Sequence, residues 1–461
     1  MIPQRSNRLQ RRSFLGIGLA GGLTAIANAT FGATRAARAK NVLVIYEQGG
    51  LSHIDTFDPK PEAPIDQRSP FTPISTSVPG IQLTSLCKHT ATIADKLAIV
   101  RSMYHKGGAI NGHPDGTQYA LSGAAPGGPV EMPDMGGVVS HRLGTRCAYL
   151  PPYIMVPGNH EQAAQTRQGF LPASTKVFKT GGRDLSDPNW KVPNLGLLTG
   201  VDAGRFANRQ DLLSNLDIAV ATPSTPIESF QSLRDQAAEI LTNPAASRAF
   251  NLAEEPDVIR EQYGTGHRGQ CYLLGRRLIE RGVRFVTVDV REPQTDATPG
   301  GFNMNWDHHD LIYTEASCGT IRNKAGGEGR YGIGHWVMMG STDRAFAALI
   351  SDLDQRGLLD ETLVCFMTEF GRTPKLNKFQ GRDHWAYGYS HAFAGAGVSG
   401  GQVIGRTDRD GGYVADRPYL PEDVAATIYE KLGIDRSRPL FTPSNRPVFL
   451  ADHGRRIEEL F

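Results

Sequence analysis

Continuous apolar runs recur along the chain, separated by loops or by stretches with helical spacing. Each run is apolar throughout rather than at alternate positions, which is typical of strands buried on both faces of a parallel sheet. The pattern therefore predicts a strand at each of the clearest runs, which lie at 41–47 (NVLVIYE), 97–103 (LAIVRSM), 153–158 (YIMVPG), 284–290 (RFVTVDV) and 362–370 (TLVCFMTEF).

Two stretches just before strands have apolar residues at helical spacing. Residues 267–282 end on a glycine before the strand at 284, and residues 341–362 begin with Ser, Thr and Asp, which can cap a helix. Helix, short turn and strand, twice over, indicate a doubly wound α/β domain. Residues 159–230 are less regular and rich in Gly, Pro, Asn and Ser, so we interpret them as an insertion or cap over the carboxyl ends of the strands.

The N-terminus has the layout of a twin-arginine export signal. Paired arginines at 11–12 precede Phe14 and Leu15, and a weakly apolar segment rich in glycine and alanine follows. The small residues of ARA at 37–39 suit a signal peptidase, which predicts a mature start near Lys40 and a periplasmic or extracellular location. The alternatives are a disordered basic N-terminus or an uncleaved anchor, but the apolar segment is too weak for a stable membrane span.

Composition narrows the class of protein. With 461 residues, 39% of them hydrophobic, the chain can form one large core or two fused ones, and we expect residues 40–461 to be a single domain. The net charge is only +2, so a nucleic-acid-binding surface is not indicated. Five scattered cysteines without a C-x-x-C pair argue against a disulfide scaffold or a structural zinc cluster.

Histidines and acids cluster just after predicted strands, where open α/β sheets build their sites. After the first strand come Glu47, two glycines, His53 and Asp55. A carboxylate followed by glycines gives a metal ion a hard ligand and room to approach the backbone. Equally, Ser52 and Asp55 could cap the next element of an ordinary turn.

A second cluster, residues 105–123, sets His105, His113 and Asp115 among glycines. The two histidines could converge on a metal, or one could act as a base or nucleophile. A third cluster runs from Asp307 to Asp310. If this segment is extended, Asp307 and His309 point the same way and can bind one metal while the histidine between them faces elsewhere.

The fourth cluster follows the predicted strand at 362–370. Glu369 ends this strand and could bind a metal, while Arg372 could hold an anion through paired hydrogen bonds. The alternative is a salt bridge between Arg372 and Glu369 that braces the turn. Asp383 and His384 follow a loop. Together the four clusters have the composition of a hydrolase with one or two metal ions.

At these residues the chain resembles an exported, sulfatase-like family of unknown function in the alkaline phosphatase superfamily. The resemblance covers nearly all of the mature chain and implies an alkaline-phosphatase-like α/β fold, with a mostly parallel central sheet flanked by helices and metal ligands at the strand ends. It rests on six motifs in order, namely GGLSHIDTFDPKP, GHPDGTQYALSG, WDHH, GLLDETLVCFMTEFGRTP, GRDHW and GGQVIGRTDRDGGYVADRP, the last continuing to PEDVAATIYEKLGID.

The resemblance also implies roles for individual residues. Superfamily members share an acid after the first strand, a nucleophile at a helix start, an Asp and His pair, a later acid and a final His. Glu47 matches the first acid, Asp307 and His309 the middle pair, Glu369 the later acid and His384 the final histidine.

Two departures from the superfamily pattern stand out. Phe370 occupies a position where a histidine ligand is expected, and His113 stands where Cys, Ser or Thr would be the nucleophile. The site could have been rebuilt, with His53 or Asp55 supplying the missing ligand and with His113 or an activated water attacking. Alternatively, the protein could be a degenerate relative that binds without cutting.

The sequence thus predicts an exported hydrolase of sulfate or phosphate esters, including polysaccharide-linked ones, that uses a divalent metal such as Zn, Ca or Mn. We expect a better-supported metal site and a second, weaker one, with Arg372 steadying the anionic group and His113 as nucleophile or general base. The expected partners are an anionic ester or sulfated glycan and the twin-arginine export machinery. The alternative is a non-catalytic cell-envelope protein that binds an anionic glycan. The expected ligands are Asp307, His309 and His384 for the first site, and Glu47, Glu369 and His53 or Asp55 for the second.

Overall fold

The structure is a computed structural model of the whole chain. Residues 1–38 of the predicted signal segment, 1–39, lie outside the described residues, as do parts of the predicted insertion and the residues on either side of the Asp307 segment. The described residues are 39–106, 108–158, 166–181, 184–187, 189–193, 195–198, 200–220, 225–291, 306–314 and 331–461.

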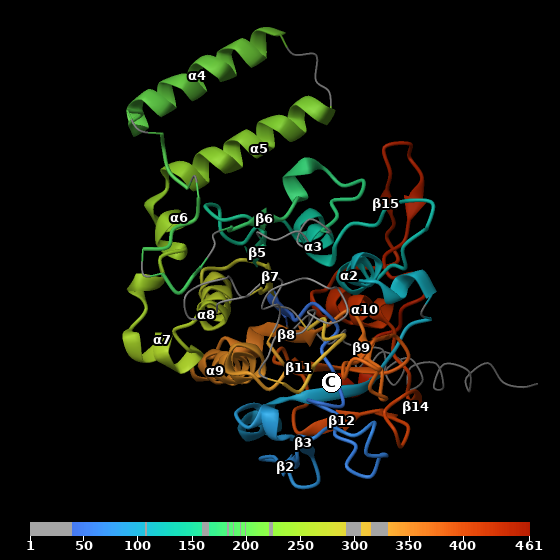
Figure 1. The fold of residues 1–461 in the computed structure, drawn as a ribbon. Helices are drawn as coiled ribbons and strands as arrows, with labels where there is room; N and C mark the ends of the chain where they lie inside the picture. The colour runs from blue at the N-terminus through green and yellow to red at the C-terminus, as the bar shows by residue number, and fades with distance from the viewer. Residues whose placement is uncertain are drawn as a thin grey trace, which may run out of the picture.

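An eight-stranded sheet forms the centre of the molecule, and all five predicted strands belong to it (Figure 1). Every neighbouring pair is parallel except those of β11, which runs antiparallel to both of its neighbours. The predicted mostly parallel sheet is therefore confirmed. Its strand order is β12 (Gln402–Ile404), β4 (Ala98–Met103), β11 (Tyr389–Ala394), β8 (Thr362–Met367), β1 (Asn41–Tyr46), β7 (Phe285–Asp289), β5 (Tyr153–Pro157) and β6 (Phe178–Lys179).

The continuous apolar pattern of β1 follows from its central position. Both faces of the strand are covered, so every residue from 41 to 46 is buried. Leu43 and Ile45 pack into the core on one face, and Val42 and Val44 into the core on the other. Removing apolar side chains from water on both faces stabilises the sheet by about 25 cal/mol for each Å² buried.

Helices cover both faces of the sheet. One face carries α8 (His267–Glu280) and α9 (Ser341–Gln355), which match the two predicted helices. The other face carries α2 (His113–Ser122), α3 (Met135–Leu143) and α10 (Pro421–Lys431). Asp343, one of the predicted capping residues of α9, instead binds another segment of the chain. Its carboxylate accepts hydrogen bonds at 2.7 Å from the backbone amides of His89 and Thr90.

The stretch predicted as an insertion or cap is not all outside the sheet, since β6 is its edge strand. The rest leads into α4 (Ala203–Val220) and α5 (Thr225–Thr242), which Figure 1 shows extending away from the sheet. The chain returns through α6 (Pro244–Ala249) and α7 (Asp257–Tyr263).

Short two-stranded ribbons complete the described structure. The ribbons are β2 (Pro73–Ser75) with β3 (Gln82–Thr84), β9 (Gly371–Arg372) with β10 (His384–Trp385), β13 (Arg406–Thr407) with β14 (Val414–Asp416), and β15 (Leu440–Phe441) with β16 (Pro447–Val448).

None of the helices in the described part of the chain is both long and apolar enough to cross a membrane.

Candidate functional site

Four segments that are far apart in the sequence converge beyond the carboxyl ends of β1 and β8. His113 is the first residue of α2, where Pro114 favours a helix start. The ribbon of β9 and β10 pairs Arg372 with His384, and Glu369 lies between β8 and this ribbon. The segment that begins at Trp306 brings the third predicted cluster to the same place.

Asp307 lies at the centre of this site. Three imidazole nitrogens surround its Oδ1 atom, at 3.1 Å for His113 Nε2, 2.9 Å for His309 Nε2 and 3.0 Å for His384 Nε2. Arg372 Nη2 lies 2.7 Å from the same oxygen. Burial alone would raise the pKa of Asp307, but the charge of Arg372 and the histidine hydrogen bonds hold it well below its usual value.

Each of the three histidines is held from behind through its Nδ1 atom. The partner is Glu369 Oε1 at 2.6 Å for His113 and Asp383 Oδ1 at 2.7 Å for His309. For His384 it is the carbonyl oxygen of Asn111, also at 2.7 Å. Because all three partners are acceptors, they favour a proton on Nδ1. Each Nε2 atom then faces inward, as a donor to Asp307 when the ring is protonated and as a lone pair when the ring is neutral.

Two of these inward nitrogens lie close together. His309 Nε2 and His384 Nε2 are 3.0 Å apart. With both Nδ1 atoms protonated, two lone pairs face each other at this distance, which is unfavourable unless a proton or a cation lies between them. Asp307, His113 and His384 also offer ligand atoms that all lie within 4.8 Å of one another. The arrangement is suited to binding a cation.

Glu369 is completely buried behind His113. Its Oε1 atom also accepts a hydrogen bond at 2.8 Å from the backbone amide of Gly49. Burial would raise the pKa of Glu369, but its bond to His113 and the charge of that histidine lower it. Burial would likewise lower the pKa of His113, and the hydrogen bonds to Asp307 and Glu369 raise it instead. Glu369 therefore contacts the site through His113.

Phe370 forms an apolar wall beside the histidines. Its ring centroid lies 5.2 Å from that of His113 and 4.6 Å from that of His384. The backbones of Gly50 and Gly116 pack against the other parts of the ring, where a Cβ atom would lie 2.8 Å and 3.1 Å from it. The position where the resemblance expects a histidine ligand is thus filled by a packed aromatic ring.

Glu47 does not join the cluster around Asp307. Its carboxylate is buried and accepts hydrogen bonds from Arg268 Nη1, the Tyr272 hydroxyl and Trp306 Nε1, at 2.6 to 2.8 Å. These donors compensate the cost of burying its charge, which is the usual way of stabilising a buried carboxylate. In the structure, Glu47 braces the packing of α8 against the strand end.

His53 and Asp55 also have protein partners. His53 Nε2 lies 2.8 Å from the carbonyl oxygen of Gly411, and burial lowers the pKa of this histidine. Asp55 accepts hydrogen bonds from the Ser52 hydroxyl at 2.6 Å, the Tyr313 hydroxyl at 2.9 Å and Arg382 Nε at 3.1 Å. These contacts hold the loop after β1 in place. Neither residue takes the place of the histidine ligand that the resemblance expects at position 370.

Arg372 is fully buried rather than facing an open pocket. Besides Asp307 it donates to the carbonyl oxygens of Gly49, Gly50 and Arg382. These contacts orient the guanidinium toward Asp307, so they position that carboxylate. They differ from the predicted role of holding a substrate anion.

The spacing argument for the third cluster agrees with the structure. Asp307 and His309 face each other, whereas His308 turns away and places its Nε2 atom 2.9 Å from the carbonyl oxygen of Tyr331. The supporting role of Asp383 was not predicted, although its position next to His384 was a signal. The carbonyl of Asn111 could not be found from sequence, because every residue has one.

Comparisons with known proteins give one family. A family model described as a protein of unknown function (DUF1501) matches residues 39–461. Among curated proteins, none matches the chain.

Several solved structures align over most of the chain with low similarity. The lipoteichoic acid synthase LtaP from Listeria monocytogenes is 10% identical, with a TM-score of 0.38 over 87% of this chain and 73% of that one. The phosphonate monoester hydrolase of Agrobacterium radiobacter is 10% identical, with a TM-score of 0.39 over 91% and 77%. The PsFucS1 sulfatase from Pseudoalteromonas sp. is 12% identical, with a TM-score of 0.35 over 87% and 69%. At these scores none of their activities is transferred to this chain.

Proposed function

The chain belongs to the DUF1501 family of proteins of unknown function, and on that premise we propose that it is a metal-dependent hydrolase of sulfate or phosphate esters. One observation carries the proposal. Three imidazoles, each held at Nδ1 by an acceptor, direct Nε2 toward a single oxygen of Asp307. The choice of ester class follows from the resemblance of the six ordered sequence motifs to the sulfatase-like family.

The donor set fits a divalent transition metal. Asp307, His309 and His384 would hold the ion, and two imidazoles with one carboxylate suit Zn²⁺ or Mn²⁺ better than Ca²⁺, which prefers oxygen ligands. When bound, the metal would polarise the ester and lower the pKa of water. Asp383 and Asn111 would keep the ligand histidines oriented, as hydrogen-bond partners of metal ligands commonly do.

His113 is the group that we assign to proton transfer. Its Nδ1 atom is occupied by Glu369, so a proton can be taken up or released at Nε2, which faces the site. Phe370 packs against one side of the ring at a tilt of 32°. Arg372 acts as a positioning residue, because it fixes the carboxylate of Asp307.

Export by the twin-arginine route to the periplasm or the outside of the cell is part of the proposal. It rests on the paired arginines at 11–12 and the small residues at 37–39. Fusion of residues 1–39 to a reporter should direct export that stops when both arginines are replaced by lysine. We further propose that residues 40–461 form one domain, since a single family model spans them.

Ester hydrolysis tests the proposed activity. Protein reconstituted with Zn²⁺ or Mn²⁺ is expected to hydrolyse 4-nitrophenyl sulfate, 4-nitrophenyl phosphate or a phenylphosphonate ester, and a chelator should abolish turnover. Bound metal with no hydrolysis of any of these esters would instead favour the non-catalytic binding protein.

A further inference from the structure

A separate cavity of about 420 Å³ adjoins the histidine site. Asp383 connects the two places, because it lines this cavity and its carboxylate bonds to His309 Nδ1. Its volume falls within the range of sites for small organic ligands, roughly 300 to 1,000 Å³. A molecule in this cavity would contact Asp383, which lies on the Nδ1 side of His309.

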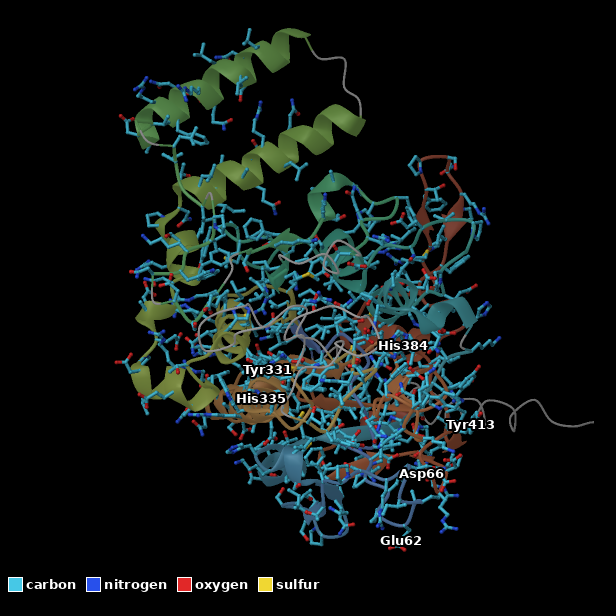
Figure 2. All side chains as sticks on the ribbon, viewed as in Figure 1. Glu62, Asp66, Tyr331, His335, His384 and Tyr413 are labelled. Carbon is cyan, nitrogen blue, oxygen red and sulfur yellow. The ribbon has the colours of Figure 1, made fainter. Side chains whose placement is uncertain are left out.

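Aromatic side chains form one wall of the cavity. Trp385 and Tyr413 line it, with ring centroids 5.4 Å apart and an interplanar angle of 72°. Tyr387 packs beside both rings, and Tyr413 is 55% exposed. Figure 2 shows Tyr413 toward the edge of the molecule, on the same side as His384. Exposed aromatic rings gathered beside a pocket are a feature of ligand sites rather than of ordinary surface.

The loop that carries Tyr413 is fixed before any ligand binds. The carboxylate of Asp408 accepts hydrogen bonds from the backbone amides of Gly412 at 2.7 Å and of Tyr413 at 3.1 Å. The indole N–H of Trp385 donates to the carbonyl oxygen of Gly412. These bonds join the two rings through one short loop, so binding would require little reordering of the wall.

Polar groups surround the aromatic wall. Gln67 and Lys375 line the cavity and carry an amide and an ammonium group. Asn377 and Thr373 line it too, but their side chains already bond to the protein, which fixes this part of the wall. A pyranose ring has an apolar face of C–H groups and an edge of hydroxyls, and this combination needs an aromatic surface bordered by mixed polar groups. An organic cation would fit less well, because the cationic side chain of Lys375 lines the same cavity.

We infer that this cavity is a saccharide-binding subsite, in which a sugar ring stacks on Tyr413 and Trp385 beside Asp383, while a neighbouring sugar of the same carbohydrate carries the ester group to the site around Asp307. The ring in the subsite is an uncharged one, because the acids Asp383 and Asp410 line the same cavity and would repel a sulfated sugar. The inference rests on the proposed ester hydrolase function for the reaction, and it names a carbohydrate ester as the substrate class.

Calorimetric titration of the purified protein tests the subsite without requiring turnover. The probes are neutral oligosaccharides prepared from cellulose, laminarin, mannan, xylan, galactan, chitin and starch, with choline as the cationic comparison. At least one oligosaccharide should bind. Tyr413→Ala should weaken that binding about tenfold, the loss of one good aromatic contact, whereas Tyr413→Phe keeps the ring and should stay within about twofold.

The outcomes separate this subsite from the proposed chemistry. Asp307→Asn should bind the oligosaccharide as the wild type does. Oligosaccharide binding without ester hydrolysis would contradict the proposed function and leave the subsite standing. Binding of none of these sugars, binding of choline alone, or an equal affinity in Tyr413→Ala would overturn the subsite.

Discussion

Glu369 holds His113 from behind, with Oε1 of the buried carboxylate 2.6 Å from Nδ1 of the imidazole. The opposite nitrogen of the ring lies 3.1 Å from Asp307. Glu369 thus affects the site only through His113, since it fixes the imidazole ring and favours a proton on its Nδ1 atom. This geometry is that of a carboxylate that orients a catalytic histidine.

Glu369→Gln should separate catalysis from metal binding. The amide keeps the size of the side chain but loses the charge that stabilises a protonated His113, so we expect kcat for an aryl ester to fall about a hundredfold. Metal content should stay at the wild-type level. Glu361→Gln, which changes an exposed glutamate that pairs with Lys40, is the matched control and should leave both values unchanged. Loss of the metal in Glu369→Gln would show that this glutamate supports a ligand.

His113→Asn tests the assignment of proton transfer directly. Removal of a general acid or base commonly lowers turnover by about 10² to 10⁴. We therefore expect a loss in this range, with retention of the metal by Asp307, His309 and His384, measured by elemental analysis on the same preparation. Metal loss in parallel with the activity would instead make His113 a ligand.

Much of the fold could be predicted because the physical signal is local. A strand buried on both faces must be apolar throughout, so the runs that became β1 and β8 stood out from their surroundings. The shared orientation of Asp307 and His309 could also be predicted, because it depends only on the spacing of two residues in an extended segment.

The partners of buried charges could not be predicted in the same way. Glu47 ends a strand next to glycines, as a metal ligand could, but Arg268 and Tyr272 reach it from α8. Which donor packs over a carboxylate is decided by the tertiary structure, and a local pattern carries no information about it. The same holds for Asp55, whose partner Arg382 lies far away in the sequence.

Gly50→Ala should destabilise the protein by contact with Phe370. Gly50 has φ +71°, and an added Cβ atom would lie 2.8 Å from the ring. We expect the free energy of unfolding to fall by about 2 to 4 kcal/mol, from backbone strain and overpacking together. Gly80→Ala is the control, because its φ is +84° but nothing lies within 4 Å of the added atom. Equal losses in chemical denaturation would contradict the packing argument.

Asp134 should make stability depend on pH. Burial raises the pKa of this carboxyl from 3.8 to about 7 in the folded protein, where the Tyr153 hydroxyl lies 3.5 Å away. Between these values the folded state keeps a proton that the unfolded state has released, so stability falls as pH rises from about 4 to 7. Asp134→Asn removes this loss, and its melting temperature should exceed that of the wild type at pH 8. At pH 4 the two should be nearly equal. A constant difference at both pH values would contradict the assignment.

Metal content is the most direct test of the site around Asp307. Wild-type protein purified from medium that contains zinc and manganese should carry about one equivalent of metal per chain, as expected for a site with three protein ligands. Asp307→Asn should fold normally and retain less than about a tenth of that amount, because the oxygen faced by all three Nε2 atoms loses its charge. Asp360→Asn, at an exposed aspartate before β8, should match the wild type. A folded wild type without metal, or full metal content in Asp307→Asn, would contradict the account.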